Sequence, residues 1–340
     1  MADHVIGEQG DGVTGDARTT PASPLSPGSY RGDAGVARAP DQEGTSPTAP
    51  VNRTQTVLAD SAGMHRKPRL TAGRAGLRIG MALLLFYAVV AIVGPFVVPG
   101  DPYKQHLRFA GDPPSWSAPL GYDELGRDML ARIVHGARYT LGIGITAIAI
   151  GGGIGIALGA VAGYLGGVAD SVIMRLVDIM LAFPSILLAL AIVSTLGTGL
   201  INLIIATGLY AIPQYARLTR ATFLSLGQTE FVHAATVSGA GAERIILRHL
   251  LPNALAPLIV QTSYATAAVI LAASGLSFLG LGVQPPTPEW GAMLSRGRDL
   301  LRVSPHVVTV PGLAIAFLIL ALNLAGDGIR DATDPRWRQR

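Results

Sequence analysis

The chain contains five long segments without a single charged residue, and these constrain its fold more than any other feature. They are residues 79–100, 139–169, 179–216, 249–288 and 303–326. A helix needs about 20 predominantly apolar residues to cross a bilayer, and within the bilayer its backbone polar groups must be satisfied internally. The chain is 49% hydrophobic and 14% charged, whereas soluble domains are roughly 25% charged. The sequence therefore predicts an all-α, polytopic membrane helix bundle.

The lengths of these segments predict about six transmembrane helices. The first, second and fifth segments accommodate one span each, and the third is long enough for two, separated by a turn at residues 195–199. In the fourth segment, residues 254–274 predict one helix, whereas the glycines and prolines that follow indicate a loop or a broken half-helix. A seventh span at that place would move the C-terminus to the other side of the membrane.

The basic residues predict how the chain is oriented. Residues 63–78 form a basic juxtamembrane segment before the first transmembrane helix at 79–100. The first part of the loop at 101–138 contains few basic residues. Because basic residues that flank spans favour the cytoplasm, the N-terminus is predicted to be cytoplasmic and the loop 101–138 extracytoplasmic. With six spans, the arginine-bearing tail at 328–340 is cytoplasmic as well.

Residues 1–62 differ in composition from the rest of the chain. They are rich in Gly, Pro, Ser, Thr and Asp and contain hardly an apolar run. Such a segment cannot bury enough surface to offset its ordering entropy, so we expect a disordered cytoplasmic tail. It is either a dispensable extension or a regulatory or partner-binding segment.

Glycines recur every fourth residue in the second uncharged segment. They are Gly151, Gly155, Gly159, Gly163 and Gly167. Residues at i and i+4 share one face of a helix, and a smooth glycine face lets another helix backbone approach closely. The stripe predicts helix packing, with a pore-lining or sliding surface as the alternative.

Two charges stand near the start of the third uncharged segment. Arg175 and Asp178 lie three residues apart, the spacing of neighbours on one helix face. We expect them to form an ion pair at the membrane edge. The alternative for Asp178 is a role in substrate binding.

The chain lacks the motifs of an enzyme active site. Its two lysines, Lys67 and Lys104, are not in a Gly-Lys-Ser/Thr phosphate loop, and it has no cysteine. No two histidines have the spacing of a metalloprotease helix, and its basic residues stand singly between apolar runs. We expect no catalytic, cofactor or metal site and no nucleic-acid partner; any ATP must be bound by another subunit.

The charged segment at 217–253, within a membrane core at 139–327, is predicted to be a cytoplasmic loop. It suggests a short helix to about residue 238, a Gly-rich turn, and an amphipathic helix that ends near Pro252. Ala234 and Ala235 leave one helix face shallow, and Gly239 and Gly241 permit unusual backbone conformations. Such a helix suits docking into a groove of another protein; an ordinary loop is the alternative.

This segment resembles the Glu-Ala-Ala…Gly…Leu-Pro coupling loop of ABC importer permeases, with His233 in place of the family's glutamate. Other stretches resemble the C-type permease subunit of dipeptide, oligopeptide and nickel importers. They are residues 119–128, 181–185, 248–253, 277–286 and 326–331. The resemblance covers about residues 77–337.

The resemblance implies a type I ABC importer permease fold in a bacterial cytoplasmic (inner) membrane. The chain would form half of a translocation path with a second homologous permease, surrounded by membrane lipid. Two cytoplasmic ATPase subunits would hold ATP and Mg and dock on Glu230, Phe231, His233, Ala234, Ala235, Gly239, Ala240 and Gly241.

On the outer face, the resemblance implies that an extracytoplasmic binding protein contacts loops near residues 100–137 and 276–304. Di- or oligopeptides are the implied substrate, with nickel, haem or another small solute as alternatives. An ion-coupled secondary transporter and a scaffold or receptor without transport are alternatives of a different class.

Overall fold

The computed structural model describes residues 70–333. The expected tail at 1–62, the first part of the basic segment at 63–78 and the end of the tail at 328–340 lie outside the described residues. Within 70–333 the chain is almost wholly helical, and its one β-pairing is an isolated bridge between Tyr122 and Asp128. The predicted all-α class is confirmed.

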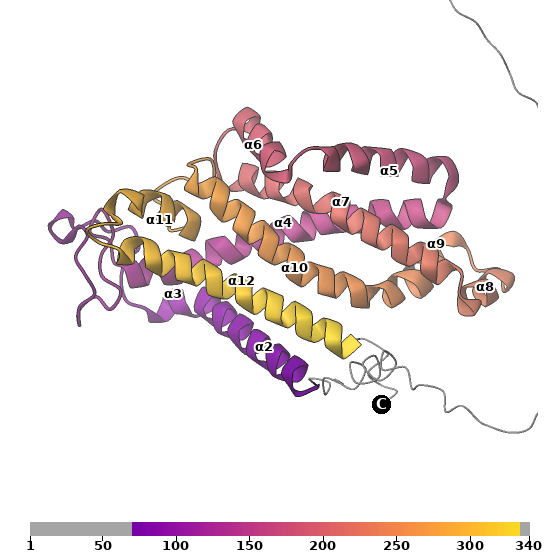
Figure 1. Cartoon of the computed structure of the whole chain (residues 1–340), viewed down its shortest axis with the longest axis horizontal. Helices are drawn as coiled ribbons and strands as arrows, with labels where there is room; N and C mark the ends of the chain where they lie inside the picture. Colours follow the sequence, from indigo (N-terminus) through magenta and orange to yellow (C-terminus); the bar gives the residue numbers. More distant parts are fainter. Residues whose placement is uncertain (1–69, 334–340) are drawn as a thin grey trace, which may run out of the picture. The chain divides into compact units, whose positions relative to one another are not determined.

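Five long helices make up most of the bundle (Figure 1). They are α2 (Leu70–Ile92), α4 (Met129–Leu165), α7 (Leu200–Gly227), α10 (Leu251–Phe278) and α12 (His306–Thr333). Shorter helices connect or cap them: α3 (Gly94–Val97), α5 (Gly167–Ala182), α6 (Ser185–Leu196), α8 (Glu230–Val237), α9 (Ala242–Ile245) and α11 (Trp290–Gly297). Helix α4 packs along α7, α2 packs along α12, and α10 lies against α4, α7 and α12.

The first and last long helices run antiparallel. A Cβ atom on Gly80 of α2 would lie 2.5 Å from the backbone nitrogen of Ala325 in α12, and Gly328 is equally close to Leu77. The start of α2 and the end of α12 therefore lie at the same end of the bundle. This arrangement agrees with an even number of membrane crossings.

Among the described residues, four helices are long and apolar enough to cross a membrane. They are Ala75–Ile92, Met129–Leu165, Ala242–Phe278 and His306–Thr333. The pair α5 and α6, bent by 90°, counts as a fifth if it is one broken span. Helix α7 has 28 residues but carries Gln214 and Arg217 among its apolar side chains. The number six stays a prediction, with α7 as the sixth candidate.

The turn expected at residues 195–199 separates α6 from α7, but the first of the two expected spans is broken. Helix α6 has only 12 residues, too few to cross about 30 Å of hydrocarbon. The helix before it starts at Gly167, after Gly166 and Gly167 turn the chain with φ values of +64° and +54°. It ends at Phe183, which is extended because Pro184 follows.

The boundaries of the expected loop at 101–138 also move. Helix α4 begins ten residues earlier than residue 139, because the Asp128 carboxylate caps it by accepting a hydrogen bond from the Ala131 nitrogen at 3.0 Å. Likewise, α10 continues past residue 274 to Phe278 before the chain turns toward α11.

The two expected outer loops come together in one cap at the end of the bundle where α11 lies (Figure 1). The Ser304 hydroxyl donates to the Gly111 carbonyl at 2.6 Å, and the His306 ring lies 3.1 Å from the Tyr122 carbonyl. The Trp290 indole donates to the Ile133 carbonyl at 3.0 Å. These bonds join segments that are far apart in the sequence.

Candidate functional site

Helix α8 lies at the opposite end of the bundle from α11, beyond the end of α7 (Figure 1). Helix α7 stops at Gly227, and Thr229 is extended, with φ −85° and ψ 148°, so that a new helix starts in another direction. The Thr229 carbonyl accepts hydrogen bonds from the nitrogens of Val232 at 3.1 Å and His233 at 3.2 Å. The predicted short helix to about residue 238 is therefore present.

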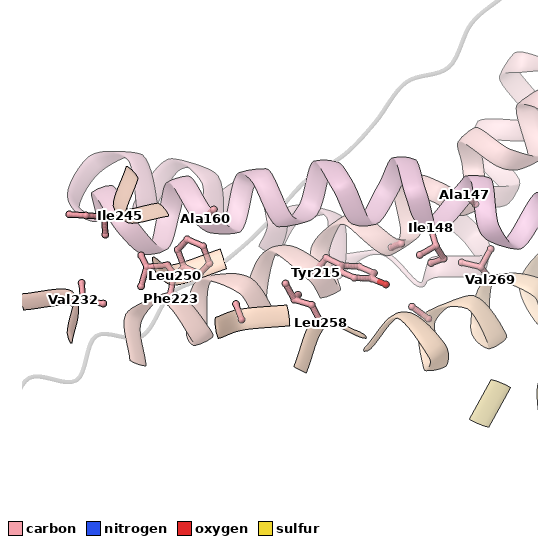
Figure 2. Close-up of a cluster of buried hydrophobic side chains, with 13 residues drawn as sticks. Ala147, Ile148, Ala160, Tyr215, Phe223, Val232, Ile245, Leu250, Leu258 and Val269 are labelled. Carbon is pink, nitrogen blue, oxygen red and sulfur yellow. The ribbon is translucent and has the colours of Figure 1, made fainter. Parts of the chain in front are cut away.

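One face of α8 is anchored in the bundle. The Val232 side chain is 6% exposed and belongs to a hydrophobic cluster with Phe223 of α7, Ile245 and Leu250 (Figure 2). This cluster continues between α4, α7 and α10. Burying a side chain of this size stabilises the fold by about 1.5–3 kcal/mol, which fixes the orientation of the helix.

The opposite face of α8 is exposed. Phe231 is 42% exposed and Val237 is 90% exposed, and Glu230 and His233 are exposed beside them. The sequence left open whether Ala234 or Ala235 points outward; Ala234 is exposed, whereas Ala235 is half-buried. The outward face, which we call the docking face, consists of Glu230, Phe231, His233, Ala234 and Val237.

Gly239 ends α8 in a left-handed conformation. Its φ is +79°, and its nitrogen donates to the Thr236 carbonyl at 3.0 Å, while the Ala240 nitrogen donates to the Ala235 carbonyl at 3.1 Å. This pair of bonds is the Schellman motif that closes a helix at its C-terminus. Gly241, by contrast, has φ −70° and ψ 161°, which any residue adopts. Of these two glycines, only Gly239 requires glycine for its backbone.

The expected helix end near Pro252 is wrong. A wide π turn at Ile246–Leu250 joins α9 to α10, and the Leu251 nitrogen donates to the Ile246 carbonyl. Pro252 stands in the first turn of α10, where its missing N–H is tolerated. Because the preceding turn widens rather than breaks, the helix runs on from Ala242 to Phe278.

The glycine stripe lies against α7. A Cβ atom on Gly155 would stand 2.6 Å from the Ile212 carbonyl oxygen, and one on Gly163 would stand 2.8 Å from Cβ of Phe223. Gly151 and Gly159 face α7 in the same way. The missing Cβ atoms allow the two backbones to touch over several turns. Gly167 lies outside the stripe, as the first residue of α5.

The expected ion pair between Arg175 and Asp178 is not the one that forms. The Asp178 carboxylate lies 2.6 Å from a guanidinium nitrogen of Arg217 on α7. Asp170, also on α5, binds Arg220 of α7 through both carboxylate oxygens. Because α5 packs along α7, an interhelical partner replaces the partner three residues away in the sequence.

A buried charge network was missed by the sequence reasoning, although its charged residues are closely spaced at 123–132. The Asp123 carboxylate accepts hydrogen bonds from the Arg127 backbone at 2.8 Å and side chain at 2.6 Å, and lies 3.1 Å from Arg132. Glu289, fully buried, caps α11 by accepting from the nitrogens of Gly291 and Ala292. Burial raises the pKa of the Glu289 carboxyl. These groups hold the cap together.

Described residues 70–333 contain no group of three or more His, Cys, Asp or Glu that could hold a metal ion. What they present is a bundle of long apolar helices with an anchored, outward-facing helix at one end and a hydrogen-bonded cap at the other. This arrangement defines an integral membrane component that presents a different surface at each end.

The chain belongs to the family of binding-protein-dependent transport system inner membrane components, whose model matches residues 155–339. It is therefore an integral protein of the inner membrane and a component of a transport system rather than an enzyme. The predicted resemblance to importer permeases is confirmed.

Curated relatives cover most of the chain. A di/tripeptide transport system permease protein of Pseudomonas aeruginosa is 48% identical over 76% of this chain and 87% of its own length. A dipeptide transport system permease protein of Haemophilus influenzae is 42% identical over 78% and 92%. A glutathione transport system permease protein of Pectobacterium atrosepticum is 40% identical over 85% and 95%.

Proposed function

We propose that the chain is a permease subunit of an ATP-driven importer of di- or oligopeptides and forms half of its translocation path. The names of three relatives support a peptide cargo, since they specify dipeptides, di/tripeptides and glutathione. None of these names specifies nickel, haem or an ion-coupled mechanism. The other half of the path would come from a second, homologous permease.

The single observation that carries the coupling role is the geometry of α8. Val232 anchors the helix to α7 through Phe223, while Phe231, Ala234 and Val237 face outward. An exposed apolar helix face of this kind fits a groove on another protein. We assign that groove to two cytoplasmic ATPase subunits, which would bind the ATP and Mg for which this sequence has no phosphate loop.

The two ends of the bundle fit this assignment. Helix α8, the start of α2 and the end of α12 lie at one end (Figure 1), which we place in the cytoplasm with both termini. The cap that contains α11 would then be extracytoplasmic and would receive the substrate-binding protein. Its exposed arginines at 298 and 302 are available for that contact.

Uptake by the complete complex in membrane vesicles tests the function. We expect ATP-dependent accumulation of a labelled dipeptide, which depends on the binding protein, and no ATP hydrolysis by this chain alone. Accumulation of nickel or haem but not of peptides would overturn the peptide assignment. Uptake that persists without the ATPase subunits and follows an ion gradient would overturn the ABC mechanism.

Orientation is tested separately with a unique thiol, because the chain has no cysteine. In vesicles that lack the ATPase subunits, Val237→Cys should react with an impermeant maleimide when the vesicles are inside-out and not when they are right-side-out. The reverse result would place α8 outside and refute its role in coupling.

A further inference from the structure

Helix α7 carries polar side chains along one face. Thr207, Tyr210, Gln214 and Arg217 follow one another at intervals of three, four and three residues, which keeps them on one side of a helix. The glycine stripe of α4 packs on the opposite side of α7. We call these four residues the polar stripe.

A pair of amides lies near the middle of the stripe. The Gln261 side chain of α10 donates a hydrogen bond to the side-chain oxygen of Gln214 at 3.1 Å, and both side chains are half-buried. Next to them, the Tyr215 hydroxyl donates to the hydroxyl of exposed Thr262 at 2.9 Å. Two primary amides that share one hydrogen bond keep a donor and an acceptor group for a further partner.

Lipid is an unfavourable neighbour for this face. The ion pair of Arg217 and Asp178 is 55% and 53% exposed at its side chains, and it continues the stripe toward the end of the bundle with α8. Charges and unpaired amides are energetically costly when they face hydrocarbon, so such groups face protein or water-filled spaces in membrane proteins.

An apolar hollow joins the other end of the stripe. It is small, with a volume of about 20 Å³, and is lined by Ile186 and Ala189 of α6, Thr207 and Tyr210 of α7, and Ala272 and Leu276 of α10. Two of its lining residues belong to the stripe. The hollow, the amide pair and the ion pair therefore follow one another along α7, from the end with α11 toward the end with α8.

We propose that the polar stripe is this chain's share of the translocation path and that Gln214 and Gln261 hydrogen-bond the peptide backbone of the substrate there. The proposal rests on the proposed function and names the residues that would carry it. A peptide bond offers one N–H and one C=O, which match the free acceptor and donor of the amide pair.

Neutral amides suit this task for a physical reason. Every peptide of any sequence presents the same backbone groups, so recognition through them tolerates different side chains. A neutral hydrogen bond contributes little net free energy, because it replaces a bond to water, so the substrate can move on.

The test uses single cysteines, since the chain contains none. Gln214→Cys and, beside the amide pair on α10, Thr262→Cys are placed in the complete complex and treated, in membrane vesicles, with a hydrophilic, charged methanethiosulfonate reagent. Leu85→Cys and Ile145→Cys are the controls, because both side chains are more than half exposed in apolar surroundings. We expect Gln214→Cys and Thr262→Cys to react at least ten-fold faster than both controls.

Protection of the thiol by added substrate tests whether peptides bind at the stripe. A dipeptide added at saturating concentration should slow the reaction at Gln214→Cys, whereas nickel should not. Reaction rates equal to those of the controls would overturn the proposal and would mean that the second permease or lipid covers the stripe. Fast reaction without protection by peptides would overturn the backbone contact. Neither result changes peptide uptake by the unmodified complex, on which the proposed function depends.

Discussion

Replacing Ala234 by glutamate should abolish docking of the ATPase subunits without changing the folding stability of the chain. The Ala234 side chain is exposed on the docking face and its helix is anchored elsewhere, through Val232. A substitution at an exposed helical position changes folding stability by about 0.5 kcal/mol or less. Within a docked interface, however, the new carboxylate must be desolvated without a partner, which costs about 3 kcal/mol or more.

Converted at about 1.4 kcal/mol per ten-fold change, this cost weakens the association of the ATPase subunits by more than 100-fold. The assay is co-purification of the ATPase subunits with Ala234→Glu from membranes, together with peptide uptake in vesicles. We expect normal amounts of the chain in the membrane, loss of the ATPase subunits, and loss of uptake.

Two controls sharpen the interpretation. Ala234→Ser adds one oxygen without charge and should keep both association and uptake. Ala235→Glu places its charge at a half-buried position and should also disturb the seating of α8 on the bundle, which lowers the melting temperature of the chain. Normal uptake by Ala234→Glu would refute the reasoning, because a docked face cannot accept an unpaired charge.

Three further substitutions probe the supporting structure. Gly155→Leu should destabilise the α4–α7 interface by about 1–3 kcal/mol through overpacking, which lowers the melting temperature. An unchanged melting temperature would contradict close packing of the two backbones, because the interface would have room for the leucine side chain. Gly239→Val should cost about 1–2 kcal/mol because it forces a β-branched residue to φ +79°, whereas Gly241→Val should leave uptake unchanged. Arg217→Ala should lower stability by up to about 1 kcal/mol, and Arg175→Ala by less; the reverse order in thermal unfolding would contradict the interhelical pair.

Features that depend on composition and local spacing were predictable from the sequence. The uncharged segments indicated the helical membrane class, because charge is costly in lipid whatever the fold. The four-residue glycine interval requires only that the segment is one helix, and α4 is continuous through it. The turn at Gly239 follows from the rule that helices commonly end with a left-handed glycine.

Features that depend on which helices are neighbours were not predictable in this way. Asp178 has Arg175 near it in the sequence, but the partner is Arg217, because the bend at Pro184 and the turn at Gly166 bring α5 along α7. Pro252 is a helix breaker by propensity, yet packing of Leu250 and Ala254 in the buried cluster keeps the helix continuous. Tertiary contacts overrode the local preference in both cases.

The proposed docking face and the proposed path share one helix. Val232 of α8 and Phe223 of α7 lie in the same buried cluster, so a displacement of α8 acts directly on the end of α7. Helix α7 cannot slide independently of α4, because the glycine stripe joins their backbones over several turns. Its contact with α5 holds two ion pairs: the part-buried pair of Arg220 and Asp170, and the exposed pair of Arg217 and Asp178, which water can replace at low cost. We therefore expect α4 and α7 to move as one unit when the ATPase subunits close, and the α5–α7 contact to loosen first at the Arg217–Asp178 pair.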